Sequence, residues 1–355
     1  MTSESQNVVV CEGLTKQYEE LVALQDFNLN LPRAHVFGYI GHNGAGKTTT
    51  IRILAGLMTA SKGRASICGV DVSSGRDRIK RLVGYMPDSF GVYDQMRVWE
   101  YLDFFGSAFK LPKKLRASRI EYVLDVTEGH YMRDRFVDTL SHGMKQRVGI
   151  ARTLMHDPQV MLLDEPANGL DPQSRVQMRK LIRRLADNGK TVIVSSHILP
   201  ELAAICDSVG IIHKGVLKAS GTVQHVLGII QRDRLMELKV AGDTAGAQQV
   251  LSADSAVSDI DTADECEGLL RFRYCADDSH LSCLLKHLME KSPVATLREV
   301  PMSLEDAYMA ISGINLDDAS SPAPSGDEAP AAVLQPVVDG EDAPEEEESE
   351  GDEHL

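Results

Sequence analysis

Eight residues from Gly41 to Thr48 read Gly-His-Asn-Gly-Ala-Gly-Lys-Thr, which is the G-x-x-x-x-G-K-T pattern of a phosphate-binding loop. The glycines let the backbone curl tightly enough to point several N–H groups inward, where they can surround the phosphates of a nucleotide. Lys47 supplies a positive charge to the same oxygens, and the hydroxyl of Thr48 is a ligand for Mg²⁺. The predicted nucleotide contacts are Gly41, His42, Asn43, Gly44, Ala45, Gly46, Lys47, Thr48 and Thr49.

The sequence around this loop decides between a ligand site and an ordinary glycine-rich turn. The preceding residues 35–40 are typical of a short buried strand. After the loop, Ile51, Leu54, Ala55 and Met58 fall at helical spacing, so a helix should begin there and direct its positive dipole end at the phosphates. Strand, loop and helix therefore follow in the order that a nucleotide site needs.

A second chemical pattern comes at Asp164 and Glu165, which follow the apolar run 160–163. A buried strand that ends in Asp164 would place a carboxylate beside the Mg²⁺ on Thr48. Glu165 would then be positioned to take a proton from an attacking water. The alternative is a strand that ends in two solvated acids, but here the pair shares a chain with a phosphate loop.

Three further residues have both an ordinary and a functional interpretation. Tyr18 is either a half-buried aromatic or a ring on which adenine stacks. Ser141 is predicted to cap a helix that runs to His156, whose N-terminal end is a second candidate anion site. His197 follows the predicted buried strand 191–195 and is either structural or within reach of a γ-phosphate.

Bulk composition fits a soluble protein of two or three domains. The chain has 355 residues, of which 43% are apolar and 25% charged. We find neither an apolar run long enough to cross a membrane nor a signal-peptide core in residues 1–7. Six cysteines without a C-x-x-C pair indicate reduced cytosolic thiols and not a disulfide framework or zinc site.

The net charge of −15 comes from the C-terminal tail. Residues 317–355 hold 14 acidic residues and no Lys or Arg, so the remaining 38 acidic and 37 basic residues nearly balance. The folded part therefore gives no sign of a nucleic-acid surface, and we expect no nucleic-acid partner. The Pro-, Ala- and acid-rich tail is predicted to be disordered, with either a solvating or a regulatory role.

The remaining pattern predicts a mixture of strands and helices. Phe27, Leu29 and Leu31 alternate with Asn28 and Asn30, which indicates a strand with one buried face. The region 14–18 is taken as a connection between this strand and one at 8–11. The inner face of a later helix is predicted to carry Val176, Ile182 and Leu185. Further predicted strands are 64–72 and 83–88, helical sequence covers 98–109 and continues to about 137, and 211–217 forms a hairpin.

In their order and spacing, these motifs closely resemble the ATP-binding cassette of ABC transporters, over roughly residues 7–222. The resemblance implies an α/β fold of the P-loop NTPase class, with a mixed core sheet, an antiparallel β subdomain and a helical subdomain. It also implies ATP and Mg²⁺ as ligands. Tyr18 matches the adenine-stacking aromatic of the family, and residues 41–48 match Walker A. Asp164 matches Walker B, Glu165 matches the catalytic glutamate, and His197 matches the switch histidine. Asp171 matches the aspartate loop, and Ser141 with Gly143 matches the signature loop.

Two departures from the family pattern affect the expected chemistry. In the signature loop His142 and Met144 replace the usual residues, while Ser141 and Gly143 remain. Asp88 stands where the family usually has a glutamine. Because Mg²⁺ prefers carboxylate oxygen to amide oxygen, we expect Asp88 to bind the metal directly or through one water.

The rest of the chain resembles the accessory part of export-type ABC ATPases. Residues 233–314 are predicted to form a small α+β domain, ferredoxin-like in fold. Its predicted strands are 235–240, 269–275 and 295–300, with a leucine-faced helix around 281–288. Ser303 and Asp306 form a capping-box pattern before a last helix.

The resemblance implies an ATP-hydrolysing subunit that powers a separate multi-span permease. The expected direction of transport is export, and the subunit is expected at the inner face of the cell membrane. Because one chain has one set of motifs, a second cassette is needed, and a homodimer is expected to hold two ATPs at its interface. Phe90, Val92 and Tyr93 are the predicted permease contact, or else they pack beneath the Asp88 loop. The alternatives are a soluble ABC ATPase acting on translation or chromosomes, and a regulatory cassette that does not hydrolyse ATP; intact Glu165 and His197 disfavour the latter.

Overall fold

The computed structural model describes residues 7–91, 93, 95–230, 234–242, 244–262, 268–300 and 303–312. None of the helices among these residues has the length and apolar character needed to cross a membrane. Val92 and the predicted disordered tail 317–355 lie outside the described residues.

A six-stranded mixed sheet forms the centre of the cassette, in the order β10-β9-β3-β8-β7-β6. Five strands are parallel, and β10 pairs with β9 as an antiparallel hairpin. Continuous apolar runs such as 160–163 suit this position, because a parallel strand is buried on both faces. The mixed sheet confirms the prediction, with strands β3 (Val36–Ile40), β6 (Val83–Met86), β7 (Val160–Asp164), β8 (Thr191–Ser196), β9 (Ser208–His213) and β10 (Val216–Gly221).

The predicted antiparallel subdomain is a second sheet, in the order β2-β1-β4-β5. Phe27, Leu29 and Leu31 are buried, as their alternation predicts. The expected connection at 14–18 is wrong: buried Leu14 pairs with Phe27, so the strand continues to a tight turn after Tyr18. The strands are β1 (Val9–Tyr18), β2 (Leu21–Leu31), β4 (Lys62–Ile67) and β5 (Val70–Asp71).

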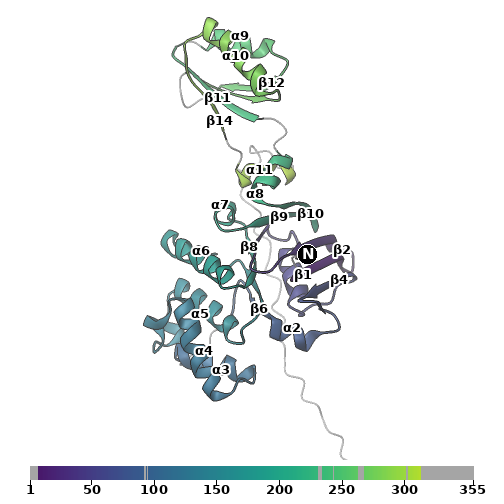
Figure 1. The fold of residues 1–355 in the computed structure, drawn as a ribbon, viewed down its shortest axis with the longest axis vertical. Helices are drawn as coiled ribbons and strands as arrows, with labels where there is room; N and C mark the ends of the chain where they lie inside the picture. Colours follow the sequence, from purple (N-terminus) through teal and green to yellow (C-terminus); the bar gives the residue numbers. More distant parts are fainter. Residues whose placement is uncertain are drawn as a thin grey trace, which may run out of the picture. The chain divides into compact units, whose positions relative to one another are not determined.

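Helices complete the cassette, and α3, α4 and α5 pack together as the helical region (Figure 1). The helical sequence expected to reach 137 ends earlier, at Val126, and 3₁₀ turns follow. Val176 was expected inside α6 but is 40% exposed, because the buried face runs through Leu181, Ile182 and Leu185. The helices are α1 (Lys47–Leu54), α2 (Arg76–Leu82), α3 (Val98–Ala108), α4 (Lys113–Val126), α5 (His142–Leu154), α6 (Pro172–Asp187), α7 (Leu199–Ala203) and α8 (Val223–Ile230).

Beyond α8 the chain forms a separate four-stranded antiparallel sheet in the order β12-β13-β11-β14. Leu238 and Phe272 from the sheet share an apolar core with Leu251 of α9 and Leu288 of α10. The sequence interpretation found β11, β13, α10 and β14 but missed β12 and α9. The elements are β11 (Arg234–Val240), α9 (Ala245–Ala253), β12 (Val257–Thr262), β13 (Leu269–Tyr274), α10 (Asp278–Lys291) and β14 (Val294–Glu299).

The last helix, α11 (Leu304–Ser312), begins at the predicted capping box. Ser303 Oγ accepts a hydrogen bond from the Asp306 backbone N–H, and Asp306 Oδ2 accepts one from the Ser303 N–H. The helix lies within the range expected for the accessory domain, yet it packs against α7, α8 and β9 of the cassette (Figure 1). Leu304 is accordingly part of the cassette core.

Candidate functional site

The phosphate loop joins buried β3 to α1, which begins at Lys47, as predicted. Gly44 and Gly46 have φ of 81° and 110°, in the left-handed region that favours glycine. At Gly46 a Cβ atom would lie 2.6 Å from the carbonyl oxygen of Ala23. This close approach explains why the loop needs glycine at position 46. The loop ends at the start of a helix, where backbone N–H groups favour anions.

Lys47 brings a buried positive charge to the loop. Its side chain is 6% exposed, and Nζ donates a hydrogen bond of 2.5 Å to the carbonyl oxygen of Gly41. The nearest carboxylate oxygen is Glu165 Oε1, 3.3 Å away. The ammonium therefore lies between the phosphate loop and the predicted base.

Thr48, at the start of α1, meets Asp164, the last residue of β7. Thr48 Oγ1 donates to Asp164 Oδ2 at 2.9 Å, and Ser195 Oγ donates to Asp164 Oδ1 at 2.6 Å. Hydroxyl and carboxylate oxygens are ligands that Mg²⁺ accepts, so this pair fits the metal. Within the described ranges, no three His, Cys, Asp or Glu side chains cluster as a metal site.

Glu165 and His197, the two predicted catalytic residues, are in direct contact. His197 Nδ1 lies 2.9 Å from Glu165 Oε2. The Glu165 backbone has φ of 50°, which is uncommon for a residue with a side chain, and its N–H donates to Ser195 Oγ. Such strained positions are often found at functional sites, where neighbouring contacts hold them.

Most of the predicted residues line one cavity of about 470 Å³. Leu21 and Ala23 of β2 also line it, and the sequence interpretation missed both. Leu21 is 67% exposed and pairs in register with Tyr18, which is 40% exposed. The sequence signal was their nearness to Tyr18 alone, since the hairpin that brings them to the cavity appears only in the structure. The lining residues are Tyr18, Leu21, Ala23, His42, Asn43, Gly44, Gly46, Lys47, Thr48, Thr49, Asp88, Asp164 and Glu165.

Ser141, Gly143 and Asp171 are not among the residues that line this cavity. Ser141 caps α5 by accepting from the Met144 N–H, as predicted, and Asp171 caps α6 by accepting from the Ser174 N–H. A Cβ on Gly143 would lie 3.1 Å from Ser174 Oγ, so the starts of the two helices pack together. These three predicted residues thus lie at or near the starts of α5 and α6 and not at the cavity.

The two departures from the family pattern meet at Asn168, a residue the sequence interpretation did not single out. Asn168 Nδ2 donates to Asp88 Oδ1 at 3.2 Å, and the Asn168 carbonyl oxygen lies 3.0 Å from His142 Nε2. Asp88 thus lines the nucleotide cavity and also contacts the segment before Asp171. Its expected contact with Mg²⁺ stays a prediction.

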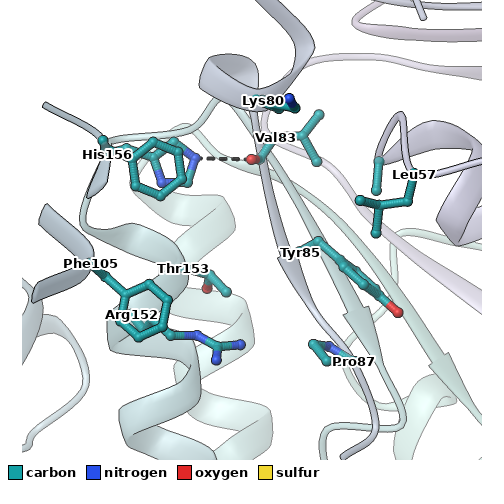
Figure 2. A pocket seen from close by; sticks show the side chains of 11 residues that line it. Leu57, Lys80, Val83, Tyr85, Pro87, Phe105, Arg152, Thr153 and His156 are labelled. Atoms are coloured by element: carbon teal, nitrogen blue, oxygen red, sulfur yellow. Dashed lines mark hydrogen bonds between the residues drawn. The ribbon is translucent and has the colours of Figure 1, made fainter. Parts of the chain in front are cut away.

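A second cavity, of about 420 Å³, lies between the core sheet and the helical region (Figure 2). Its lining is largely apolar, and Leu57 at its edge is 62% exposed. Neither of the two predicted permease contacts that the structure describes lines it: Phe90 packs against Gly149, and Tyr93 joins an aromatic cluster with Phe104. We name it the groove, formed by Ala55, Leu57, Lys80, Val83, Tyr85, Pro87, Phe105, Phe109, Arg152, Thr153 and His156.

Comparison with known proteins agrees with this geometry. The family model described as "ABC transporter" matches residues 24–168. The Nod factor export ATP-binding protein I of Ralstonia nicotianae is 31% identical over 317 residues, which cover 88% of this chain and 95% of that protein. The chain belongs to the ATP-binding proteins of ABC transporters. It is therefore an ATPase subunit, and we name the cavity around the phosphate loop, the candidate site for its ATP, the ATP cavity.

Other relatives match a smaller share of the chain. The bacitracin transport ATP-binding protein BcrA of Bacillus licheniformis is 38% identical over 59% of this chain and 68% of its own length. Among solved structures, cbiO1 from Clostridium perfringens, described as part of the ABC transporter complex cbiONQ, is 27% identical with a TM-score of 0.58. That match covers 63% of this chain and 93% of cbiO1. This match supports the ABC ATPase fold.

Proposed function

We propose that two copies of this chain bind two ATP molecules between them and power export through a separate multi-span permease. The observation that carries the direction of transport is similarity along nearly the whole chain to a protein named for Nod factor export. The match includes the region of the accessory sheet, which we take as a ferredoxin-like domain because its order is β-α-β-β-α-β. The chain would work at the inner face of the membrane, bound to its permease.

Each residue around the ATP cavity has a proposed role. Glu165 accepts a proton from the attacking water, and His197, hydrogen-bonded to Glu165, orients that carboxylate. Lys47 and the loop N–H groups hold the phosphates. Thr48, Asp164 and Asp88 would hold Mg²⁺, which when bound neutralises phosphate charge. Tyr18 and Leu21 form an exposed apolar wall on which adenine could stack.

The second copy follows from the position of the signature residues. Ser141, Gly143 and Asp171 do not line the cavity of their own chain. Ser141 and Asp171 lie at the N-terminal ends of α5 and α6, where backbone N–H groups favour an anion. In the proposed dimer they complete the site on the other copy.

The groove is the proposed docking site for a cytoplasmic segment of the permease. It combines exposed Leu57 with Phe105 and Phe109, whose ring stacks on His156 at 3.9 Å. An exposed apolar surface of this kind is typical of a protein-binding site. Figure 2 shows Leu57, Tyr85 and Phe105 around the cavity.

Isolation of the tagged chain from membranes of its own cell tests this proposal. Wild-type chain should bring down a multi-span membrane protein, and Leu57→Asp should lose it while still binding ATP. Leu115→Asp is the matched control, since Leu115 is 45% exposed on α4 and does not line the groove. Recovery of the same membrane protein with Leu57→Asp would contradict docking in the groove. If the wild-type chain brings down no multi-span membrane protein, the proposal that it binds a permease is contradicted.

A further inference from the structure

A hydrogen bond joins the end of the described chain to the phosphate loop. The backbone N–H of His42 donates to Tyr308 Oη at 3.1 Å, across 266 positions of sequence. Tyr308 belongs to α11, which follows the accessory sheet in the chain. Nothing in the loop motif itself predicts this partner.

Helix α11 is held in place by the cassette. Leu304 is 4% exposed and Ala307 is fully buried, and the ring of Tyr308 packs on the same core. The capping contacts between Ser303 and Asp306 fix where the helix begins. The packing of α11 and of the Tyr308 ring therefore fixes the position of the Tyr308 hydroxyl beside the loop.

The peptide groups around His42 connect this hydroxyl to the ATP site. The His42 carbonyl oxygen accepts from the Ala45 N–H at 3.1 Å and lies 3.4 Å from Lys47 Nζ. Gly41 leaves the loop little room to shift, because a Cβ there would lie 2.8 Å from the Ile212 side chain. The first turn of the loop is thus bound by Tyr308 on its N–H and by Lys47 on its carbonyl.

We infer that Tyr308 is a positioning residue of the phosphate loop, and that α11 makes ATP affinity depend on the C-terminal segment. Without the hydroxyl, the His42 N–H loses its partner and the first turn of the loop becomes less ordered. ATP binding must then order the loop, and the free energy that this ordering costs lowers the affinity for ATP. This inference concerns nucleotide binding and holds whether or not the chain drives export.

Tyr308→Phe tests the inference because it removes one oxygen and keeps the packed ring. We expect the Kd for ATP, measured by equilibrium dialysis, to rise about 3- to 10-fold, with kcat changed by less than about 2-fold. Tyr274→Phe is the matched control, since its hydroxyl bonds only to Asp277 and His280 within the accessory domain, as the structure describes it. Its Kd should equal that of wild type.

Amide hydrogen exchange on the nucleotide-free protein gives a second readout. The His42 amide should exchange faster in Tyr308→Phe and at the wild-type rate in Tyr274→Phe. If Tyr308→Phe lowers the melting temperature but leaves both the Kd and His42 exchange unchanged, Tyr308 only packs α11 and the inference is wrong.

Discussion

Glu165 takes its position from three neighbours that each lie at least 30 positions away from it in the sequence. Ser195 accepts its backbone N–H, His197 bonds one carboxylate oxygen, and Lys47 lies beside the other. Glu165 Oε1 is buried 3.3 Å from Lys47 Nζ without a hydrogen bond of good geometry. The two carboxylate oxygens of Glu165 therefore have different neighbours, the Lys47 ammonium for Oε1 and the His197 ring for Oε2.

Replacement of Glu165 by Gln should remove the base while keeping the shape of the site. ATP turnover is expected to fall roughly 10²-fold or more, the scale of a lost general base, with ATP binding retained. Turnover at saturating ATP and nucleotide binding would be measured on the same preparation. Glu12→Gln, a surface change in β1, should behave as wild type. Equal turnover in Glu165→Gln and wild type would refute the assignment.

Site residues that form continuous motifs were predictable, and those that depend on long-range pairing were not. The loop 41–48 and the pair Asp164–Glu165 carry their chemistry in their own spacing. Leu21 reaches the ATP cavity only because the β1–β2 hairpin turns after Tyr18. Asn168 contacts Asp88 across 80 positions, and no local pattern indicates that contact.

At the scale of the elements, the junction of α5 and β6 shows how a groove wall is built. His156 follows α5, and its Nε2 lies 2.9 Å from the Val83 carbonyl oxygen, to which it donates in the neutral form (Figure 2). Its Nδ1 is buried without a hydrogen-bond partner among the described residues. Burial therefore lowers the pKa of His156 below its ordinary value of 6.5.

This lowered pKa has a definite sign in the pH dependence of stability. In the unfolded chain His156 binds a proton near pH 6.5, and in the folded chain it does so only at lower pH. The contribution of His156 to the free energy of unfolding is therefore complete above pH 6.5, and it is lost as the pH falls from there toward the folded-state pKa. Melting temperature measured from pH 7.5 to 5 should therefore fall less steeply for His156→Gln than for wild type. Exposed His225→Gln should keep the wild-type slope. An unchanged slope in His156→Gln would contradict this reading.

Elements whose residues alternate or run apolar were predicted well, because burial repeats along one segment. Val160–Asp164 and Phe27–Leu31 are examples. Val176 was placed wrongly because helix periodicity alone does not say which face meets the core. The small residues of α9 and the polar residues of β12 gave little periodic signal. Ala247 and Leu251 of α9 are buried in the core that also contains Phe272 and Leu288.

For the whole molecule, one chain supplies each functional group once. The ATP cavity and the caps of α5 and α6 are separate on the same cassette. If the caps serve a partner's ATP, neither copy can work alone. A two-fold dimer satisfies this requirement, since it places each cap group opposite the other copy's cavity.

Mixing two defective chains tests this central claim most directly. Lys47→Ala cannot hold phosphate in its own cavity, and Ser141→Arg blocks the cap that serves its partner. Each alone should be inactive, because every homodimer site lacks one of the two residues. A 1:1 mixture should regain up to about a quarter of the wild-type ATPase rate, since half of random dimers are mixed and each has one intact site. A mixture as inactive as its parents, or full ATPase activity from a monomer at high dilution, would contradict the account.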